Sequence, residues 1–155
     1  MEAAVASKNA IQKGKDNSSF FGFDELAERL QTIDSNALPF NDNFFDITIA
    51  ESCLDSMLFE NASVLINEIS RVTKKYIYFS VIACDANPHN KSAEDVIVET
   101  DHEHGTIQSY YNERRIIDLV SNFDTEIAFL RKITETEVSQ KAPLNARFFV
   151  VLDVS

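Results

Sequence analysis

Hydrophobic positions repeat with two periods along the chain, and these separate strands from helices. Short β-branched or aromatic runs predict strands at residues 30–33, 46–50, 76–82, 126–134 and 146–154. Apolar residues three or four apart predict helices at residues 61–73 and 112–121, opening on Asn61 and Asn112 as capping residues. Helices are also expected at residues 2–13 and 24–28. The turn residues of 14–19 predict a loop there.

This order of elements predicts an α/β fold. Strand and helix alternate twice before two consecutive strands, so the central strands should be parallel and the last two should form an antiparallel hairpin. The sequence has no internal repeat and no long linker, so its 155 residues are expected to form a single domain, 1–155. A chain of this length buries roughly 70% of its unfolded surface on folding, so it does not need disulfide bonds for stability.

The charge of the chain narrows the class of partner. There are 25 acidic residues against 14 Lys and Arg, a formal net charge of −11. Because Lys and Arg neutralise phosphates, this balance disfavours nucleic acid and an anionic membrane surface as partners. The apolar runs are too short to span a bilayer. The two cysteines, Cys53 and Cys84, do not form a disulfide scaffold, so a cytoplasmic protein is expected.

Two sequence words resemble those of a known family. LPFNDNFFD at residues 38–46 resembles the LPFxDxxFD signature of class I S-adenosylmethionine-dependent methyltransferases. EISRV at residues 68–72 is similar to the EIxRV word that ends the helix after that family's fourth strand. The resemblance covers about residues 30–154. It implies a Rossmann-like sheet, mostly parallel with a C-terminal antiparallel hairpin, and methyl transfer from S-adenosylmethionine to an unidentified acceptor, a small molecule or another kind.

The resemblance also implies where the cofactor lies. In open α/β sheets, ligands bind outside the carboxyl ends of the strands. Asp34 would accept a hydrogen bond from the adenine amine, with the backbone N–H of Ser35 nearby. Glu51 and Ser52 follow the family's fourth strand, close to the methionine part of the cofactor. The alternative for Asp34 is a turn-forming residue at the end of a strand.

Part of the family pattern is missing from the sequence. Its three glycines, Gly14, Gly22 and Gly105, are too scattered for the family's glycine-rich turn, so the domain is expected to be N-terminally truncated or degenerate. Without the family's first two strands, strand 30–33 would lack a neighbour. The edge of strand 46–50 would be bare, which invites a partner chain or a second copy. The alternative to an enzyme is therefore a non-catalytic methyltransferase-like interaction protein or subunit.

All three histidines fall in the polar segment 85–108. His102 and His104 alternate with acidic residues, and His89 lies upstream. Alternate residues share a face of an extended chain, as a metal site requires, but no third ligand follows at useful spacing. A solvated loop is the favoured interpretation, and no metal is expected. Within the resemblance this segment lies over the active-site rim, which makes His102 and His104 candidate bases toward the acceptor.

Overall fold

The chain forms two compact units, Met1–Pro39 and Phe40–Ser155, which are described separately. The structure, a computed structural model, describes residues 3–5, 8–34, 36–87, 91–99, 104–136 and 145–155. Among these residues, no helix has the length and apolarity needed to cross a bilayer.

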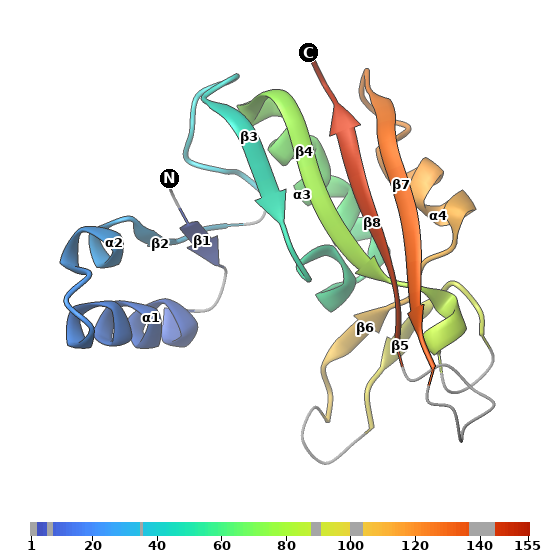
Figure 1. The fold of residues 1–155 in the computed structure, drawn as a ribbon, viewed down its shortest axis with the longest axis horizontal. Coiled ribbons are helices and arrows are strands. Elements are labelled where there is room, and N and C mark those ends of the chain that lie inside the picture. Colours follow the sequence, from blue (N-terminus) through green and yellow to red (C-terminus); the bar gives the residue numbers. More distant parts are fainter. Residues whose placement is uncertain (1–2, 6–7, 35, 88–90, 100–103, 137–144) are drawn as a thin grey trace. The chain divides into compact units, whose positions relative to one another are not determined.

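The second unit is built on a four-stranded sheet with the order β3-β4-β8-β7 (Figure 1). The strands are β3 (Phe45–Ala50), β4 (Thr73–Ile82), β7 (Glu126–Glu135) and β8 (Asn145–Asp153). β3 and β4 are parallel, while β8 runs antiparallel to both β4 and β7. The predicted α/β fold, with parallel strands followed by a C-terminal antiparallel hairpin, is confirmed.

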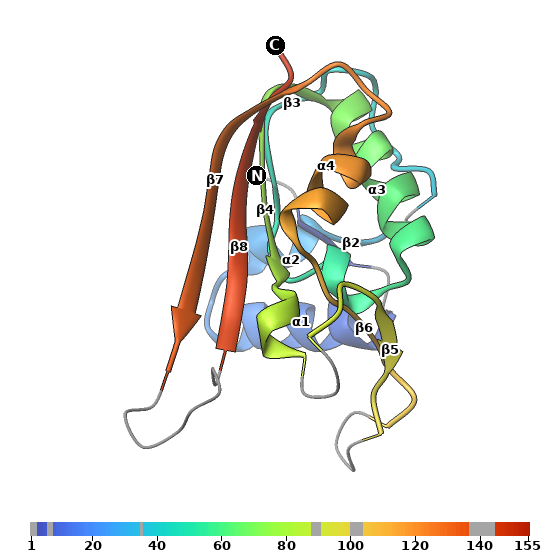
Figure 2. The same ribbon diagram turned by 90° about the vertical axis from the view of Figure 1, so that its right-hand side faces the viewer.

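Two helices, α3 (Phe59–Val72) and α4 (Glu113–Val120), lie on the same side of this sheet (Figure 2). The strand residues that face them are buried, because alternate residues of a strand share a face. The buried core includes Ile66, Ile77, Phe79, Val81, Ile116, Leu119, Val150 and Leu152. The opposite face carries apolar side chains that are exposed by two fifths or more, namely Ile47, Ile49, Tyr76, Phe129 and Ile133.

The two helices begin in different ways. α4 follows Asn112, whose side chain accepts the backbone N–H of Arg115 at 2.8 Å, so this predicted cap is confirmed. The prediction that Asn61 caps α3 is wrong, because that helix already begins at Phe59. The backbone N–H of Phe59 donates to a carboxylate oxygen of Asp95 at 3.0 Å. A cap supplied by a distant segment leaves no local sequence signature.

The polar segment 85–108 contains most of a small hairpin. β5 (Asp95–Ile97) pairs antiparallel with β6 (Ile107–Ser109). The Asp95 carboxylate accepts the Ser109 hydroxyl at 2.6 Å and forms an ion pair with Arg115 of α4. The Arg115 guanidinium lies 4.6 Å from the centroid of the Phe59 ring. These contacts tie the hairpin to both helices.

The first unit departs from the prediction. It contains β1 (Ala3–Val5), α1 (Lys8–Phe20), α2 (Asp24–Glu28) and β2 (Leu30–Thr32). The helix expected at 2–13 is confirmed only from Lys8 onward, because a strand comes first, and the loop expected at 14–19 is wrong, because α1 runs on to Phe20. The expectation that strand 30–33 lacks a neighbour is also wrong, because β1 pairs with β2 in parallel. A three-residue strand is too short to show an alternating pattern.

A glycine inside α1 has a packing reason. A Cβ atom on Gly14 would lie 3.1 Å from the Cδ1 atom of Leu30 on β2. That is tighter than side-chain contacts normally are, so the helix and strand approach closely where glycine stands. Gly14, which suggested a turn in the sequence, therefore lies within a helix and allows it to pack closely against β2.

Candidate functional site

Polar side chains of the second unit gather where β3 and β4 end. Glu51 and Ser52 form the turn directly after β3, and Asp55 lies in the 3₁₀ turn η1 (Leu54–Ser56). Arg147 lies near the start of β8, paired with Ile82 at the end of β4. Parallel strands bring their carboxyl ends to one edge, where α/β folds bind ligands, and antiparallel β8 adds its first residues there.

Hydrogen bonds join these side chains in a continuous chain. The Ser80 hydroxyl donates to Oε1 of Glu51 at 2.7 Å. Nη2 of Arg147 lies 3.2 Å from Ser80 Oγ, 3.0 Å from Ser52 Oγ and 2.7 Å from Oδ2 of Asp55. Glu51, at the end of β3, is therefore connected to Asp55 through Ser80 and Arg147.

Asp55 is a buried carboxylate. Its side chain is 2% exposed, and its Oδ2 also accepts the backbone N–H of Ile82 at 2.9 Å. Burial raises the pKa of the Asp55 carboxyl above its usual range, while Arg147 and the Ile82 N–H oppose that rise. Nε of Arg147 is buried with no hydrogen-bond partner among the described residues. The pair is thus charged, poorly solvated and incompletely satisfied.

The turn after β3 has an unusual backbone. Ser52 has a φ of 51°, in the left-handed region that residues other than glycine rarely adopt. Such conformations occur preferentially at functional sites, where the surrounding structure holds them. Here the backbone N–H of Ser52 lies 3.4 Å from the Ser80 hydroxyl. Burial, followed by the hydrogen bond with Glu51, raises the pKa of Tyr78 on β4.

A cavity of about 260 Å³ adjoins Asp55. Its lining combines residues of the strand edge with residues of the β5–β6 region: Asp55, Ser56, Ile82, Val98, Thr106, Ile107 and Gln108. β6 lies against η1, so the hairpin forms one wall. Among the described residues, this lining contains carboxylate, hydroxyl and amide groups but neither Lys nor Arg.

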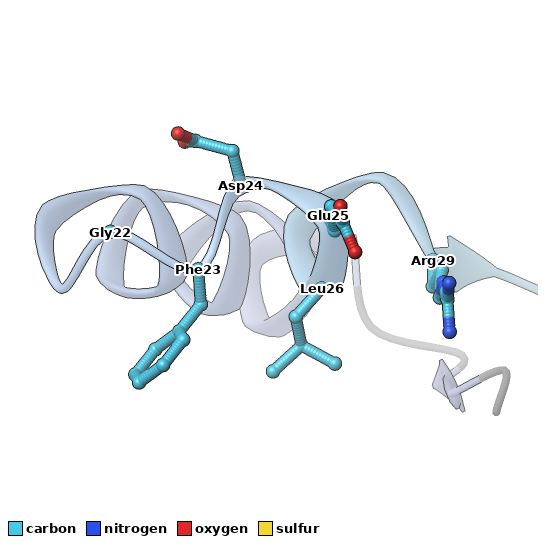
Figure 3. Close-up of a pocket in the computed structure, with 6 residues that line it drawn as sticks. All are labelled: Gly22, Phe23, Asp24, Glu25, Leu26 and Arg29. Carbon is cyan, nitrogen blue, oxygen red and sulfur yellow. The ribbon is translucent and has the colours of Figure 1, made fainter.

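The first unit has a cavity of its own, shown in Figure 3. It measures about 440 Å³ and is lined by Gly22, Phe23, Asp24, Glu25, Leu26 and Arg29. In the figure Phe23 and Leu26 point the same way, and they are 61% and 42% exposed. All six residues come from one short stretch of chain. This hollow does not collect groups from separate elements as the edge of β3 and β4 does.

The site residues expected from the sequence have different outcomes. Glu51 and Ser52 lie together at the strand edge, joined through Ser80 and Arg147. Asp34 belongs to the first unit, where its exposed carboxylate accepts the backbone N–H of Asn36 at 2.9 Å. That bond is the one expected of a turn-forming aspartate. Ser35 lies outside the described residues.

Of the histidines, only His104 belongs to the described residues. It is exposed and precedes Gly105 in the turn that leads to β6. His89 and His102 lie outside the described residues, so the metal alternative at 101–104 stays an untested hypothesis. No group of metal-binding side chains occurs within the part of the chain that the structure describes.

The sequence reasoning missed Asp55, Ser80 and Arg147. A signal was present for two of them, because Ser80 and Arg147 interrupt the apolar runs YIYFSVI and ARFFVV. Polar residues inside buried strands need partners. Asp55 gave no comparable signal, since it stands in a polar turn.

The two sequence motifs that carry the resemblance, residues 38–46 and 68–72, contact each other. Nη1 of Arg71 donates to the carbonyl oxygen of Phe40 at 2.9 Å and to Asp42 at 2.7 Å. Nε and Nη2 of Arg71 donate to Glu68, each at 2.8 Å. The backbone N–H of Asn43 donates to the Arg71 carbonyl at 2.9 Å. These residues brace the loop that leads into β3, at the opposite end of the strand from Glu51.

Comparison with protein families gives a match over most of the chain. A family model described as a methyltransferase domain matches residues 6–138. No curated protein matches the chain.

Solved structures match the fold at low sequence identity. A SAM-dependent methyltransferase from Methanosarcina mazei has a TM-score of 0.76 and 16% identity, over 97% of this chain and 79% of that one. The PH0226 protein from Pyrococcus horikoshii OT3 has a TM-score of 0.70 and 14% identity, over 99% and 71%. The [4+2]-cyclase SpnF has a TM-score of 0.62 and 14% identity, over 97% and 65%. These likenesses confirm the Rossmann-like α/β fold.

Proposed function

The chain belongs to the methyltransferase domain family, and on that premise we propose that it transfers the methyl group of S-adenosylmethionine to an acceptor. The observation that carries the proposal is the polar chain from Glu51 to Asp55 at the carboxyl edge of β3 and β4. That edge is where an α/β sheet of this kind binds its ligand. The Methanosarcina mazei neighbour is named as SAM-dependent, which supports the choice of cofactor.

The residues at this edge suit the cofactor chemically. S-adenosylmethionine carries an ammonium group, hydroxyl groups and a sulfonium, all of which a carboxylate favours. Glu51 offers a carboxylate oriented by the Ser80 hydroxyl, and Ser52 offers a hydroxyl on a turn with a fixed backbone. We assign Glu51 and Ser52 to the methionine part. Asp34 and Ser35 are assigned to the adenine, in keeping with the resemblance.

The cofactor supplies an activated methyl group on a positively charged sulfur. The chain then has to position an acceptor in line with that methyl group, and good positioning supplies about 7–11 kcal/mol at best. The polar side chains at the strand edge bind and orient the reactants and hold a proton. His102 and His104 stay hypotheses as bases. The two cysteines are free, which supports a cytoplasmic location.

The test is calorimetric titration of the purified chain with S-adenosylhomocysteine. Glu51→Gln should weaken binding about tenfold or more, because a hydrogen bond to a charged group is lost. Glu60→Gln, at the exposed start of α3, is the matched control and should bind as the parent does. A folded parent chain that releases no binding heat would contradict the proposal.

A second candidate function is a non-catalytic interaction protein. β3 lies at the edge of the described sheet, and Ile47 and Ile49 on it are 58% and 68% exposed. An apolar edge strand is a template for pairing with another chain. The neighbour named as a cyclase also shows that this fold hosts more than one activity. Absence of cofactor binding together with self-association or partner capture would favour this second function.

A further inference from the structure

We propose that Arg147 is a positioning residue of the cofactor site. It fixes Glu51 as a hydrogen-bond acceptor and Ser52 as a donor, and so orients the amino-acid part of S-adenosylmethionine. The inference rests on the proposed methyl transfer and deepens it. Arg147 lies outside both sequence motifs of the resemblance and stands 95 residues after Ser52.

The side chains of the site differ in their access to solvent. Glu51 and Ser52 are exposed on the turn after β3, so a ligand can reach both of them. The Arg147 side chain is 19% exposed, and that of Asp55 is 2% exposed. The exposed pair is therefore suited to contact the ligand, and the buried pair is suited to hold the contacting groups in place.

The hydroxyl of Ser80 transmits the effect of Arg147 to Glu51. A serine hydroxyl has one hydrogen to donate and two acceptor positions. A guanidinium and a backbone N–H can only donate, so Ser80 Oγ accepts from Nη2 of Arg147 at 3.2 Å and from the Ser52 N–H at 3.4 Å. The one hydrogen of Ser80 is then donated to Oε1 of Glu51, at 2.7 Å. Through Ser80, Arg147 therefore sets the orientation of the Glu51 carboxylate.

The same guanidinium fixes Ser52 as a donor. Nη2 of Arg147 lies 3.0 Å from Ser52 Oγ, which accepts that hydrogen bond and keeps its own O–H for a ligand. The backbone of the turn is held as well, since the Ser56 hydroxyl donates to the Ser52 carbonyl at 3.2 Å. Ser52 has a φ of 51° among these contacts, a conformation that persists only where the surrounding structure enforces it.

This pattern of donor and acceptor matches the two charged groups of an α-amino acid. An ammonium group only donates hydrogen bonds, and a carboxylate only accepts them. The Glu51 carboxylate therefore suits the ammonium group of the cofactor, and the Ser52 hydroxyl suits its carboxylate. A carboxylate has about four acceptor positions, so Glu51 retains capacity beyond its hydrogen bonds with Ser80 and Tyr78.

Asp55 holds Arg147 in place. Oδ2 of Asp55 lies 2.7 Å from Nη2 of Arg147 and also accepts the Ile82 N–H at 2.9 Å. Within the described part of the chain, the buried Nε of Arg147 has no hydrogen-bond partner. Buried ion pairs are often no more stabilising than apolar side chains of similar size. The arrangement is therefore explained better by the positions that it enforces than by stability.

The test compares two ligands by calorimetric titration of the full chain. S-adenosylhomocysteine carries the ammonium and carboxylate groups, and methylthioadenosine has the same nucleoside and a thioether without them. The parent chain should bind S-adenosylhomocysteine at least about tenfold more tightly, because methylthioadenosine cannot form the hydrogen bonds between charged groups. Equal binding of the two ligands would overturn the inference.

Arg147→Met should remove this preference. It should weaken binding of S-adenosylhomocysteine about tenfold and change binding of methylthioadenosine less than about twofold. Because the single variant leaves the buried Asp55 charge unpaired, the double variant Arg147→Met with Asp55→Asn is measured as well. The double variant should regain stability without regaining the preference. A preference that returns with stability would show that Arg147 is merely structural, and would overturn the inference.

A third variant covers the case in which both Arg147 variants fail to fold. Ser80→Ala keeps the ion pair of Arg147 with Asp55 and should weaken binding of S-adenosylhomocysteine with the same selectivity. Unchanged binding of both ligands by Ser80→Ala would contradict the role of Arg147. Arg131→Met, the same change as Arg147→Met at an exposed position on β7, is the matched control and should bind both ligands as the parent does.

The two ligands also separate this inference from the proposed function. If the parent chain binds neither ligand, the proposed methyl transfer fails and the role of Arg147 fails with it. If the parent chain prefers S-adenosylhomocysteine and the folded variants keep that preference, the methyl transfer stands and the positioning role is wrong.

Discussion

The two faces of the β3-β4-β8-β7 sheet come from the same strands but differ sharply in burial. On the face toward α3 and α4, Phe79 and Val150 are completely buried. On the opposite face, Ile49 is 68% and Phe129 is 47% exposed. Both faces are apolar in sequence. The difference shows that an apolar residue in a strand indicates only that the position can be buried. Whether it is buried depends on whether a helix or another element packs over that face.

The polar site lies on the edge where these two faces end. Tyr78, Ser80 and Arg147 occupy strand positions on the less covered face, next to the turn of Glu51 and Ser52. A site that exchanges ligands needs access, which a face packed under helices does not offer. The helix-covered face thus provides stability, and the other face carries polar side chains of the proposed site.

The largest expected effect is on the covered face. Phe79→Ala should lower the free energy of unfolding by about 3–5 kcal/mol, because a fully buried ring leaves a cavity. Urea unfolding measures the change. Phe129→Ala on the exposed face is the control and should cost less than half as much. Equal losses would mean that the two faces are covered alike in solution.

Removing Arg147 tests the polar edge. Arg147→Met should cost about 3 kcal/mol at neutral pH, because the buried Asp55 charge loses its partner. Without Arg147 the pKa of Asp55 rises further, so acidification protonates the carboxyl and reduces the cost. Unfolding measured at pH 7 and pH 5 checks this. Adding Asp55→Asn should restore part of the stability, and no restoration would argue against the ion pair.

Tyr111, beneath η1, should set the alkaline limit of stability. Burial raises the pKa of Tyr111 from 10.0 to about 12. A phenol whose pKa is raised by folding stabilises the protein below pH 10, and this contribution is lost as the pH rises from 10 to 12. The loss is on the order of 2–3 kcal/mol. Absorbance at 295 nm should show a tyrosine phase that titrates at about pH 12, and Tyr111→Phe should remove that phase.

Replacing each of the two asparagines that were expected to cap helices should change stability by different amounts. Asn112→Ala removes the hydrogen bond to the Arg115 N–H and should cost about 1 kcal/mol. Asn61→Ala lies inside α3 and should change stability by less than about 0.5 kcal/mol. Thermal unfolding compares them. A larger loss at Asn61 would reverse the assignment of the two helix starts.

The smallest effect is expected on the exposed face. Ile49→Thr retains a β-branched side chain and should change stability by no more than about 0.5 kcal/mol. Unfolding measured at several protein concentrations is the check. A concentration-dependent loss above about 2 kcal/mol would show that another copy covers this face, and would favour the interaction function.

Prediction from sequence succeeded where a local pattern was long or chemically specific. The ten-residue strands β4 and β7, the Asn112 cap and the terminal hairpin were all predicted close to their observed limits. The two family words predicted the fold, and the structure shows why they occur together: Arg71 holds the loop before β3. These features depend on neighbours in the chain or on the contacts of the single residue Arg71.

The amino-acid sequence by itself determined the alternation of strands and helices, the family, and Glu51 and Ser52 as residues of the strand edge. The tertiary structure alone decided that Asp95 caps α3, that β1 pairs with β2, and that Ser80 and Arg147 connect Glu51 to Asp55. The physical reason is sequence distance. The hydrogen bond from Arg147 to Asp55 spans 92 residues. No periodicity or propensity along the chain encodes such a contact, because it exists only after the strands have paired.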